Sequence, residues 1–111
     1  MFEIMNKEKN IIVGPKQQNL AEFFKDFSKN YPDFLSKNII VDLSDRSIAS
    51  ISEILVFLNI AKAHLDAATS FVIIAKGVNF DKLPDELVVV PTMLEALDII
   101  EMDEITRDLG F

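Results

Sequence analysis

Short apolar runs alternate with longer amphipathic segments along this chain. The central run, residues 39–43, reads IIVDL and is rich in β-branched residues, as in a strand buried on both faces. Small polar residues follow it, and Ser50 with Glu53 has the spacing of a capping box at the start of a helix. This stretch therefore predicts a buried strand, a polar loop and a helix from Ile51 to about Ala68.

Four further segments have the composition of strands. Residues 2–5 and 11–13 are short apolar stretches separated by a polar turn, which indicates a hairpin. Residues 71–75 and 87–90 are apolar runs like the central one. Alternation of such runs with helices is typical of an α/β domain. We therefore expect one domain over residues 1–111: a mixed sheet of about five strands with helices packed mainly on one face, in the order ββαβαβ, loop, βα.

Two more helices are expected from spacing and capping. An aromatic stripe at helical spacing precedes Pro32, and we interpret it as core because aromatic rings dominate buried area. The stripe consists of Leu20, Phe23, Phe24, Phe27 and Tyr31. The last helix opens with Thr92 and Glu95 at capping-box spacing, and its acidic part from residue 101 is expected to kink or to form a second short helix. Its predicted apolar face consists of Met93, Ala96, Leu97 and Ile100. We interpret its acids as a solvated helix face, with an electrostatic docking surface for a basic partner as the alternative.

The helix predicted over residues 51–68 has two apolar stripes. The stripe expected to face the core consists of Ile51, Ile54, Leu55, Leu58, Ala61 and Leu65. The second stripe consists of Val56, Ile60, Ala63 and Ala67. Two interpretations of the second stripe stay open. Either the helix is covered on both sides by its own fold, or the stripe is a surface for a partner or for a second copy in a homodimer, because contiguous apolar patches usually mark contacts.

Charge and composition restrict the classes of function. The 111 residues contain no cysteine and carry a net charge of -7. The whole excess of acids lies in residues 50–111, where a phosphate backbone would be repelled, so nucleic acid is not the expected partner. No apolar run reaches the roughly 18 residues of a membrane span. The charged N-terminus is unlike a signal peptide, and we therefore expect a cytoplasmic protein.

Candidate catalytic residues are few. His64 is the only histidine, and with neither a cysteine nor a second histidine to share a metal we place it on the surface. Asp42 and Asp45 follow the central strand, at the end of the sheet where α/β proteins place their sites. With Asp81 they would serve an Mg²⁺-dependent enzyme, yet Asp-x-x-Asp at a strand end is more often a turn or a cap. We expect no catalysis, metal or other cofactor, and keep the magnesium enzyme as the less favoured alternative.

The central stretch and the order of elements resemble the STAS domain, the fold of bacterial anti-sigma-factor antagonists. VDLSDRSIASISEILVFL is similar, without a gap, to the family's strand end, D-L-S turn and D-S-S-G-L helix start. SFVIIAK resembles the next strand, and VVVPTMLEAL the final strand and helix. Ile51 stands where the family has its phosphorylatable serine, while Ser50, Ser52 and Glu53 stand where it has Asp, Ser and Gly.

The resemblance implies a small regulatory module that binds a protein, such as an anti-sigma factor or a kinase-like regulator, without the usual serine switch. The expected docking surface combines the loop after the central strand with the second apolar stripe of the following helix. It consists of Ser44, Asp45, Arg46, Ser47, Ser50, Val56, Ile60 and Ala63. Binding of a small ligand or a lipid is the alternative that the apolar stripe leaves open.

Overall fold

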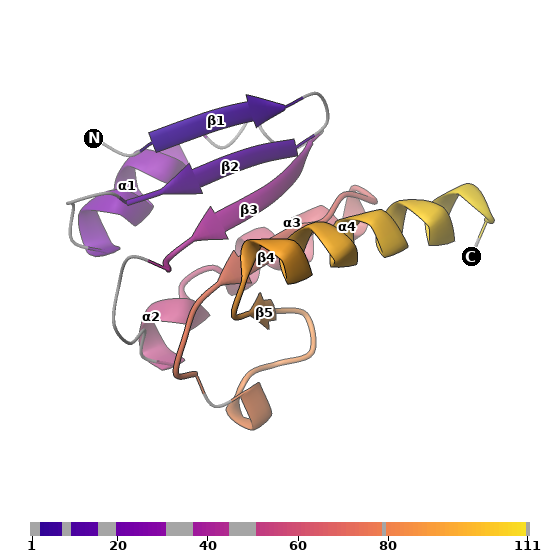
Figure 1. The fold of residues 1–111 in the computed structure, drawn as a ribbon. Coiled ribbons are helices and arrows are strands. Elements are labelled where there is room, and N and C mark those ends of the chain that lie inside the picture. The colour runs from indigo at the N-terminus through magenta and orange to yellow at the C-terminus, as the bar shows by residue number, and fades with distance from the viewer. Residues whose placement is uncertain are drawn as a thin grey trace.

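A single mixed sheet organises the fold (Figure 1). The computed structural model describes residues 3–7, 10–15, 20–30, 37–44, 51–78 and 80–110. The strands of this part are β1 (Glu3–Lys7), β2 (Asn10–Gly14), β3 (Asn38–Asp42), β4 (Phe71–Ile74) and β5 (Val88–Val90). They follow one another across the sheet in sequence order, with β1 antiparallel to β2 and all later pairs parallel. The mixed α/β sheet expected from the sequence is confirmed.

The predicted strand positions agree with the structure to within a few residues. The runs at residues 39–43, 71–75 and 87–90 become β3, β4 and β5. In the N-terminal hairpin, β1 extends to Lys7 and β2 begins at Asn10, so the connection is shorter than the polar turn that we expected. Polar side chains had suggested a longer turn, but the backbone of an edge hairpin pairs regardless of side-chain polarity.

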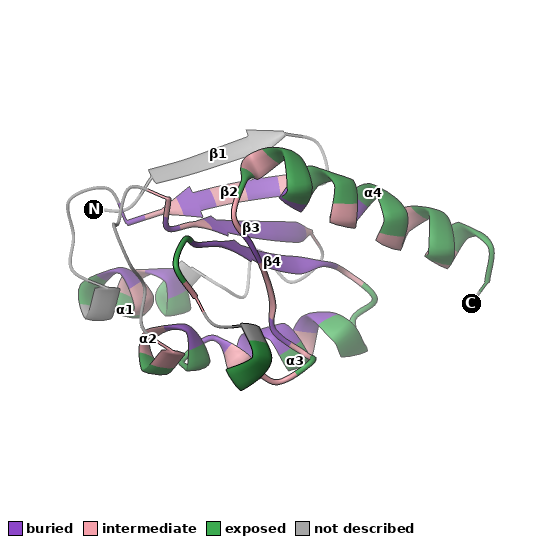
Figure 2. Cartoon of the chain, turned by 60° about the horizontal axis from the view of Figure 1, so that its bottom comes forward, coloured by how far each residue is buried: buried purple, intermediate pink, exposed green. Residues whose placement is uncertain are grey.

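Helices cover both faces of the sheet (Figure 2). The helices of the described chain are α1 (Leu20–Asn30), α2 (Ile51–Leu55), α3 (Leu58–Asp66) and α4 (Met93–Asp108), with a 3₁₀ turn, η2 (Phe80–Lys82), between β4 and β5. α1, α2 and α3 pack on one face, as expected, whereas α4 lies on the opposite face. Val78 and Leu83 of the β4–β5 connection pack with the α1–α3 core, whereas Met93 and Ala96 after β5 pack on the other face. None of the described helices is both long and apolar enough to span a bilayer.

Aromatic rings fill the core under α1, α2 and α3. Phe57 is fully buried, and its ring centroid lies 6.2 Å from that of Phe27 and 6.0 Å from that of Phe71. Phe23, also fully buried, lies 6.3 Å from Phe57. The aromatic stripe is therefore confirmed as core at Phe23 and Phe27. Phe24 is half-buried at the rim of the cluster, and the Leu20 and Tyr31 side chains lie outside the described residues.

The helix predicted over residues 51–68 is interrupted in the structure. α2 ends at Leu55, and the Phe57 amide donates to the carbonyl of Ile54 at 3.1 Å, a tighter turn than an α-helix makes. α3 then begins at Leu58. The interruption accompanies the insertion of Phe57 into the aromatic core and turns the inward face toward it. The buried side chains of this region are Ile54, Phe57, Ile60, Ala61 and His64.

Two predictions about this region and one about α4 are therefore wrong. Leu55 and Leu65 were expected to face the core, but both are exposed because the inward face lies around Phe57. α4 runs unbroken from Met93 to Asp108, with no kink in its acidic part. The Thr92 hydroxyl accepts from the Glu95 amide at 3.2 Å, so the predicted cap at its start is confirmed.

Candidate functional site

The carboxyl end of β3 is the place where the sequence predicted a docking surface. Asp42 closes the strand, and its Oδ1 accepts hydrogen bonds from the Ser44 amide at 2.9 Å and from the Ser44 hydroxyl at 2.5 Å. A carboxylate bonded two residues onward is a turn-forming arrangement. Gly14 lies against this turn, because a Cβ at Gly14 would come within 3.2 Å of the Asp42 carbonyl oxygen. Asp42 and Ser44 thus shape the exit from the sheet.

The remaining loop residues of the predicted surface cannot be placed on this framework. Asp45, Arg46, Ser47 and Ser50 lie outside the described residues, so their part in docking stays a prediction. Asp81, the third carboxylate considered for magnesium, is exposed on η2. Among the residues that the structure describes, no three His, Asp or Glu side chains gather in a way that would hold a metal ion.

The helical part of the predicted surface is divided between core and solvent. Val56 is 45% exposed, and Leu55 beside it is 37% exposed. Ile60 packs in the α1–α3 core at 9% exposure, and Ala63 is half-buried. The structure therefore brings two adjacent apolar side chains to the surface where α2 ends. Leu55 was missed because a continuous helix would have placed it inside.

His64 is buried, which corrects its predicted surface position. Its ring is fully buried, lies 5.6 Å from the ring of Phe71, and shares a 2.6 Å hydrogen bond with the hydroxyl of Thr69 through Nδ1. Burial lowers the pKa of His64 from its ordinary value of 6.5 to about 4, because the charged form loses its hydration. At neutral pH this histidine is therefore an uncharged core residue that fixes the end of α3.

A polar network joins four segments at the amino end of the sheet. Asn38 donates through Nδ2 to Asn10 at 3.0 Å and to Glu104 at 2.8 Å, and its Oδ1 accepts from the Ser70 amide at 2.8 Å. The Ser70 hydroxyl in turn donates to Asp103 at 2.7 Å. Asn38 and Ser70 are almost completely buried, so these bonds satisfy groups that water does not reach.

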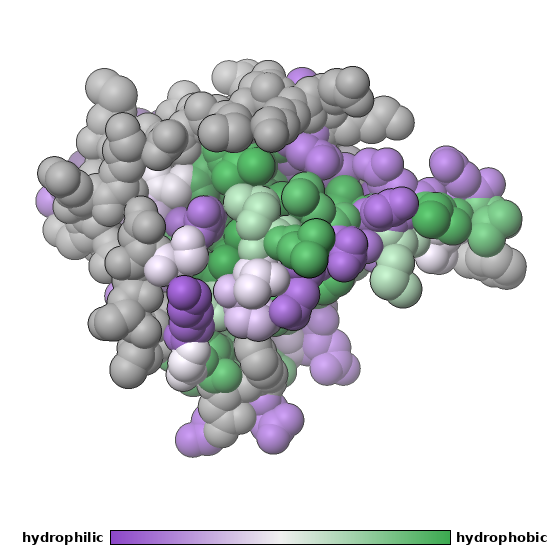
Figure 3. Space-filling model, viewed as in Figure 1, coloured by the Kyte–Doolittle hydropathy of each residue, from purple (hydrophilic) through white to green (hydrophobic). Residues whose placement is uncertain are grey.

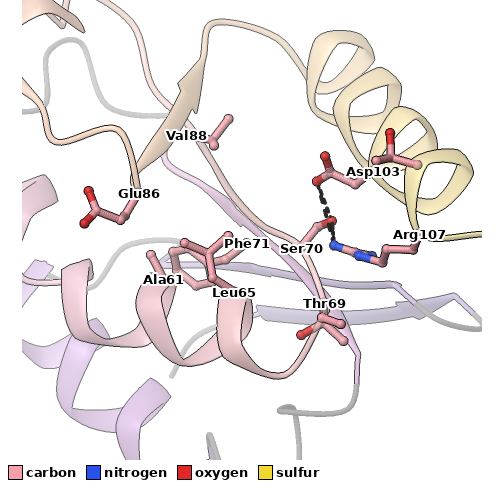
Figure 4. A pocket seen from close by; sticks show the side chains of 11 residues that line it. Ala61, Leu65, Thr69, Ser70, Phe71, Glu86, Val88, Asp103 and Arg107 are labelled. Atoms are coloured by element: carbon pink, nitrogen blue, oxygen red, sulfur yellow. Dashed lines mark hydrogen bonds and ion pairs between the residues drawn. The ribbon is translucent and has the colours of Figure 1, made fainter. Parts of the chain in front are cut away.

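Arg107 completes this network from the last turn of α4 (Figure 4). Its Nη2 donates to the Ser70 hydroxyl at 2.8 Å and lies 3.9 Å from Asp103 Oδ2. A hollow of about 320 Å³ opens beside these groups, between α3 and α4. Apolar side chains, including Leu65, Phe71 and Val88, line one part of it. The hollow has the size of a small-molecule site, and Glu86, Asp103 and Arg107 supply its charged groups.

The outward side of α4 carries most of the exposed large apolar side chains of the described chain. The exposed large apolar residues on this helix are Leu94, Leu97, Met102, Ile105 and Leu109, which follows its last turn. Ala96 and Ile100 face the sheet instead, together with the half-buried Met93 and Ile99. Leu97 was predicted on the inward face. Its exposure corrects that prediction, since the face that meets the sheet lies on the other side of Ala96.

Sequence reasoning did not find the polar network, and it favoured a solvated helix face for the acidic part of α4 over a docking surface for a basic partner. Asn38 and Ser70 bond across 32 residues of chain, and Asn38 and Glu104 across 66, so no local motif signals these contacts. The apolar residues of the outward face were present in the sequence. Their mixture with acids resembled an ordinary solvated helix face.

Comparisons with known proteins add no relative. No protein-family model matches the sequence. No curated protein matches it either. The function therefore has to be inferred from the surfaces and the residues of the chain itself.

Proposed function

We propose that this chain is a STAS-like regulatory module that binds a protein partner without catalysing a reaction. The order of elements supports the proposal, because two hairpin strands, a helix, a central strand and a helical segment follow one another as the resemblance implies, although that segment is divided into α2 and α3. The mixed sheet also agrees with that expectation. The partner expected from the resemblance is an anti-sigma factor or a kinase-like regulator in the cytoplasm.

Exposure of Leu55 and Val56 is the observation that carries this proposal. The two side chains lie at the junction of α2 and α3, only a few residues after the polar loop that begins at Ser44. Adjacent exposed apolar groups form the kind of patch that a protein partner buries. Ala63 adds a half-buried contact at most, and Ile60 contributes through the core rather than through direct contact.

Regulation in this module differs from that of the family's serine switch. Ile51, the first residue of α2, has no hydroxyl to accept a phosphate, and it is half-buried. An apolar residue at this place favours constitutive docking, because position 51 itself cannot be phosphorylated. Complex formation would then be regulated through the amount of the partner or of this chain in the cell.

Affinity capture with matched variants tests the proposed function. Tagged wild type, Val56→Asp and Arg46→Glu are compared in native lysate with Leu65→Asp, which changes a 61% exposed leucine on α3 away from this surface. Circular dichroism first establishes that all four proteins are folded. We expect one stoichiometric partner to be lost from the Val56 and Arg46 variants and retained by the Leu65 variant. Retention by all variants would place docking elsewhere.

The hollow at the amino end favours small-ligand binding as a second candidate function. Its volume of about 320 Å³ lies in the range of ligand pockets, and polar groups of Thr69, Ser70 and Arg107 line one side of it. A fragment screen by protein-observed NMR would decide. Shifts that cluster at these residues would support ligand binding. Their absence would leave protein docking as the one candidate function.

A further inference from the structure

The outward face of α4 has a composition that stability does not explain. The exposed fractions of its large apolar side chains run from 40% at Leu97 to 70% at Leu94. At about 100° per residue these side chains share an arc of roughly 140° on the side turned away from Ala96 and Ile100. From Leu94 to Leu109 the face is about 22 Å long, at about 1.5 Å per residue. Asp98, Glu101 and Asp108 fall within the same arc, so this is a ridge about as long as a typical helix on which apolar and acidic side chains are interspersed.

The charges on this face have one sign. The exposed charged residues of α4 are Glu95, Asp98, Glu101 and Asp108, all acidic. Arg107, the one base of the helix, is held on the inward side by Ser70 and Asp103. Figure 3 shows hydrophobic and hydrophilic side chains alternating along the part of α4 that extends beyond the sheet.

The combination of exposed apolar side chains and acids on α4 indicates the kind of partner that would bind there. A second copy of the same face would bring acids against acids, which opposes pairing of α4 with itself. A basic surface would be attracted by the acids, and its apolar side chains would remove the exposed leucines and isoleucine from water. We propose that the outward face of α4 binds a basic amphipathic helix of a partner protein, with apolar side chains on the ridge and Lys or Arg beside Asp98 and Glu101.

A helix is the form of partner that fits this ridge. Side chains at the i, i+3 and i+4 positions of a helix form ridges and grooves. A second helix packs into these grooves with its axis roughly 8–10 Å from the first. α4 is presented rigidly, because Ala96 and Ile100 pack on the sheet and Asp103 and Glu104 are bonded to Ser70 and Asn38. A rigid helix loses little conformational freedom on binding, which favours affinity.

The α4 surface is separate from the surface of the proposed function. α2, with Leu55 and Val56, packs on the opposite face of the sheet, so one partner helix cannot cover both. Each surface can therefore be tested without the other. The module would hold two protein segments at once, one on each side of its sheet.

A designed peptide pair provides the probe. The first peptide is an amphipathic helix of Leu and Lys, and the second has the same Leu positions with Glu in place of Lys. Each is titrated into the ¹⁵N-labelled full chain, and amide shifts map the contact. We expect the Lys peptide to shift residues 94–109 of α4, with affinity that falls as salt rises, and the Glu peptide to shift none.

Matched variants separate specific docking from general attraction to an acidic protein. Leu94→Ser is compared with Leu65→Ser, since both leucines are more than half exposed and only Leu94 lies on α4. A double variant on α4, Asp98→Asn and Glu101→Gln, is compared with a control double variant. The control, Asp66→Asn and Asp81→Asn, removes two exposed acids elsewhere. We expect each α4 variant to weaken binding about five- to tenfold, or roughly 1 kcal/mol, and each control less than about twofold.

Three results would overturn the proposal. They are equal affinity for the Lys and Glu peptides, shifts concentrated outside α4, and equal loss in the α4 and control variants. Absence of any shift with the Lys peptide at millimolar concentration would overturn it as well. The shift map of the wild type tests the proposal even if one variant fails to fold.

Discussion

The two faces of the sheet are covered in different ways. Under α1, α2 and α3, phenylalanine rings and branched strand side chains form a closed aromatic core. Under α4 only aliphatic side chains meet, and the fully buried part of the helix is Ala96 and Ile100. Hydrogen bonds from Asn38 and Ser70 hold α4 in addition. One face thus closes an aromatic core, whereas the helix on the other is held by aliphatic packing and hydrogen bonds and keeps exposed apolar side chains on its outer side.

Removing a central ring should show most clearly how differently the two faces contribute to stability. Phe57→Ala is expected to lower the free energy of unfolding by about 3–5 kcal/mol, because Phe57 is fully buried among four other rings. Ile100→Ala on the α4 side should cost about 2–3 kcal/mol, because a buried aliphatic side chain removes less buried area than a central ring. Urea unfolding measures both. Equal losses would show that α4 is held as firmly as the aromatic side.

Acid should weaken the aromatic face through His64. The unfolded chain binds a proton near pH 6.5, whereas the folded chain binds it only near pH 4 because burial lowers the pKa. Stability from this residue is therefore complete above pH 6.5 and is lost as the pH falls toward 4, by about 3 kcal/mol at most.

His64→Phe provides the comparison for this prediction, because it keeps an aromatic ring and cannot be protonated. Between pH 7.5 and 4.5 the wild type should lose more unfolding free energy than the variant, since the carboxylates that titrate are common to both. A constant difference between the two proteins across this range would contradict the buried neutral histidine.

Loss of the polar network should affect the α4 side by a smaller amount. Asn38→Ala removes the partner of the buried Ser70 amide and the bond to Glu104, which should cost about 1–3 kcal/mol. Asn10→Ala removes a single bond to Asn38 and serves as the control, with a smaller expected loss. Hydrogen exchange should become faster in the last turns of α4 in the Asn38 variant. Unchanged exchange there would mean that apolar contacts alone hold the helix.

The outward side of α4 should contribute almost nothing to stability. Leu94→Ser and Ile105→Ser change exposed side chains, and each should alter the free energy of unfolding by less than about 0.5 kcal/mol. Such neutrality would agree with a face kept apolar for binding. A loss above about 1 kcal/mol in thermal or urea unfolding would instead reveal a structural role for this face.

The sequence was most informative where a local pattern determines the structure. Buried β-branched runs predicted β3, β4 and β5, and Thr92 with Glu95 predicted the start of α4. The helix after β3 was predicted less well, because its inward face depends on where Phe57 finds space among rings from α1 and β4. The packing of Phe57 thus leaves Leu55 exposed and His64 buried.

The candidate site could be predicted only in part for the same reason. Val56 was correctly recognised as an apolar residue outside the inward stripe, and it lies at the surface. Ile60 belongs to the core, since the turn between α2 and α3 rotates it inward. The network of Asn38 and Ser70 joins segments far apart in sequence, and pairing at that distance follows from the sheet order rather than from any motif.

Hydroxyl-radical footprinting of the captured complex tests the docking function most directly. The chain is labelled alone and together with its captured partner, and oxidation of Leu55 and Val56 is followed by mass spectrometry, with the 61% exposed Leu65 as the internal control. Docking at the end of α2 predicts that oxidation of Leu55 and Val56 falls at least about threefold in the complex, since a buried contact excludes the solvent that carries the radical. Leu65 should be labelled equally in both states. Undiminished oxidation of Leu55 and Val56 in a stoichiometric complex would contradict docking at this surface.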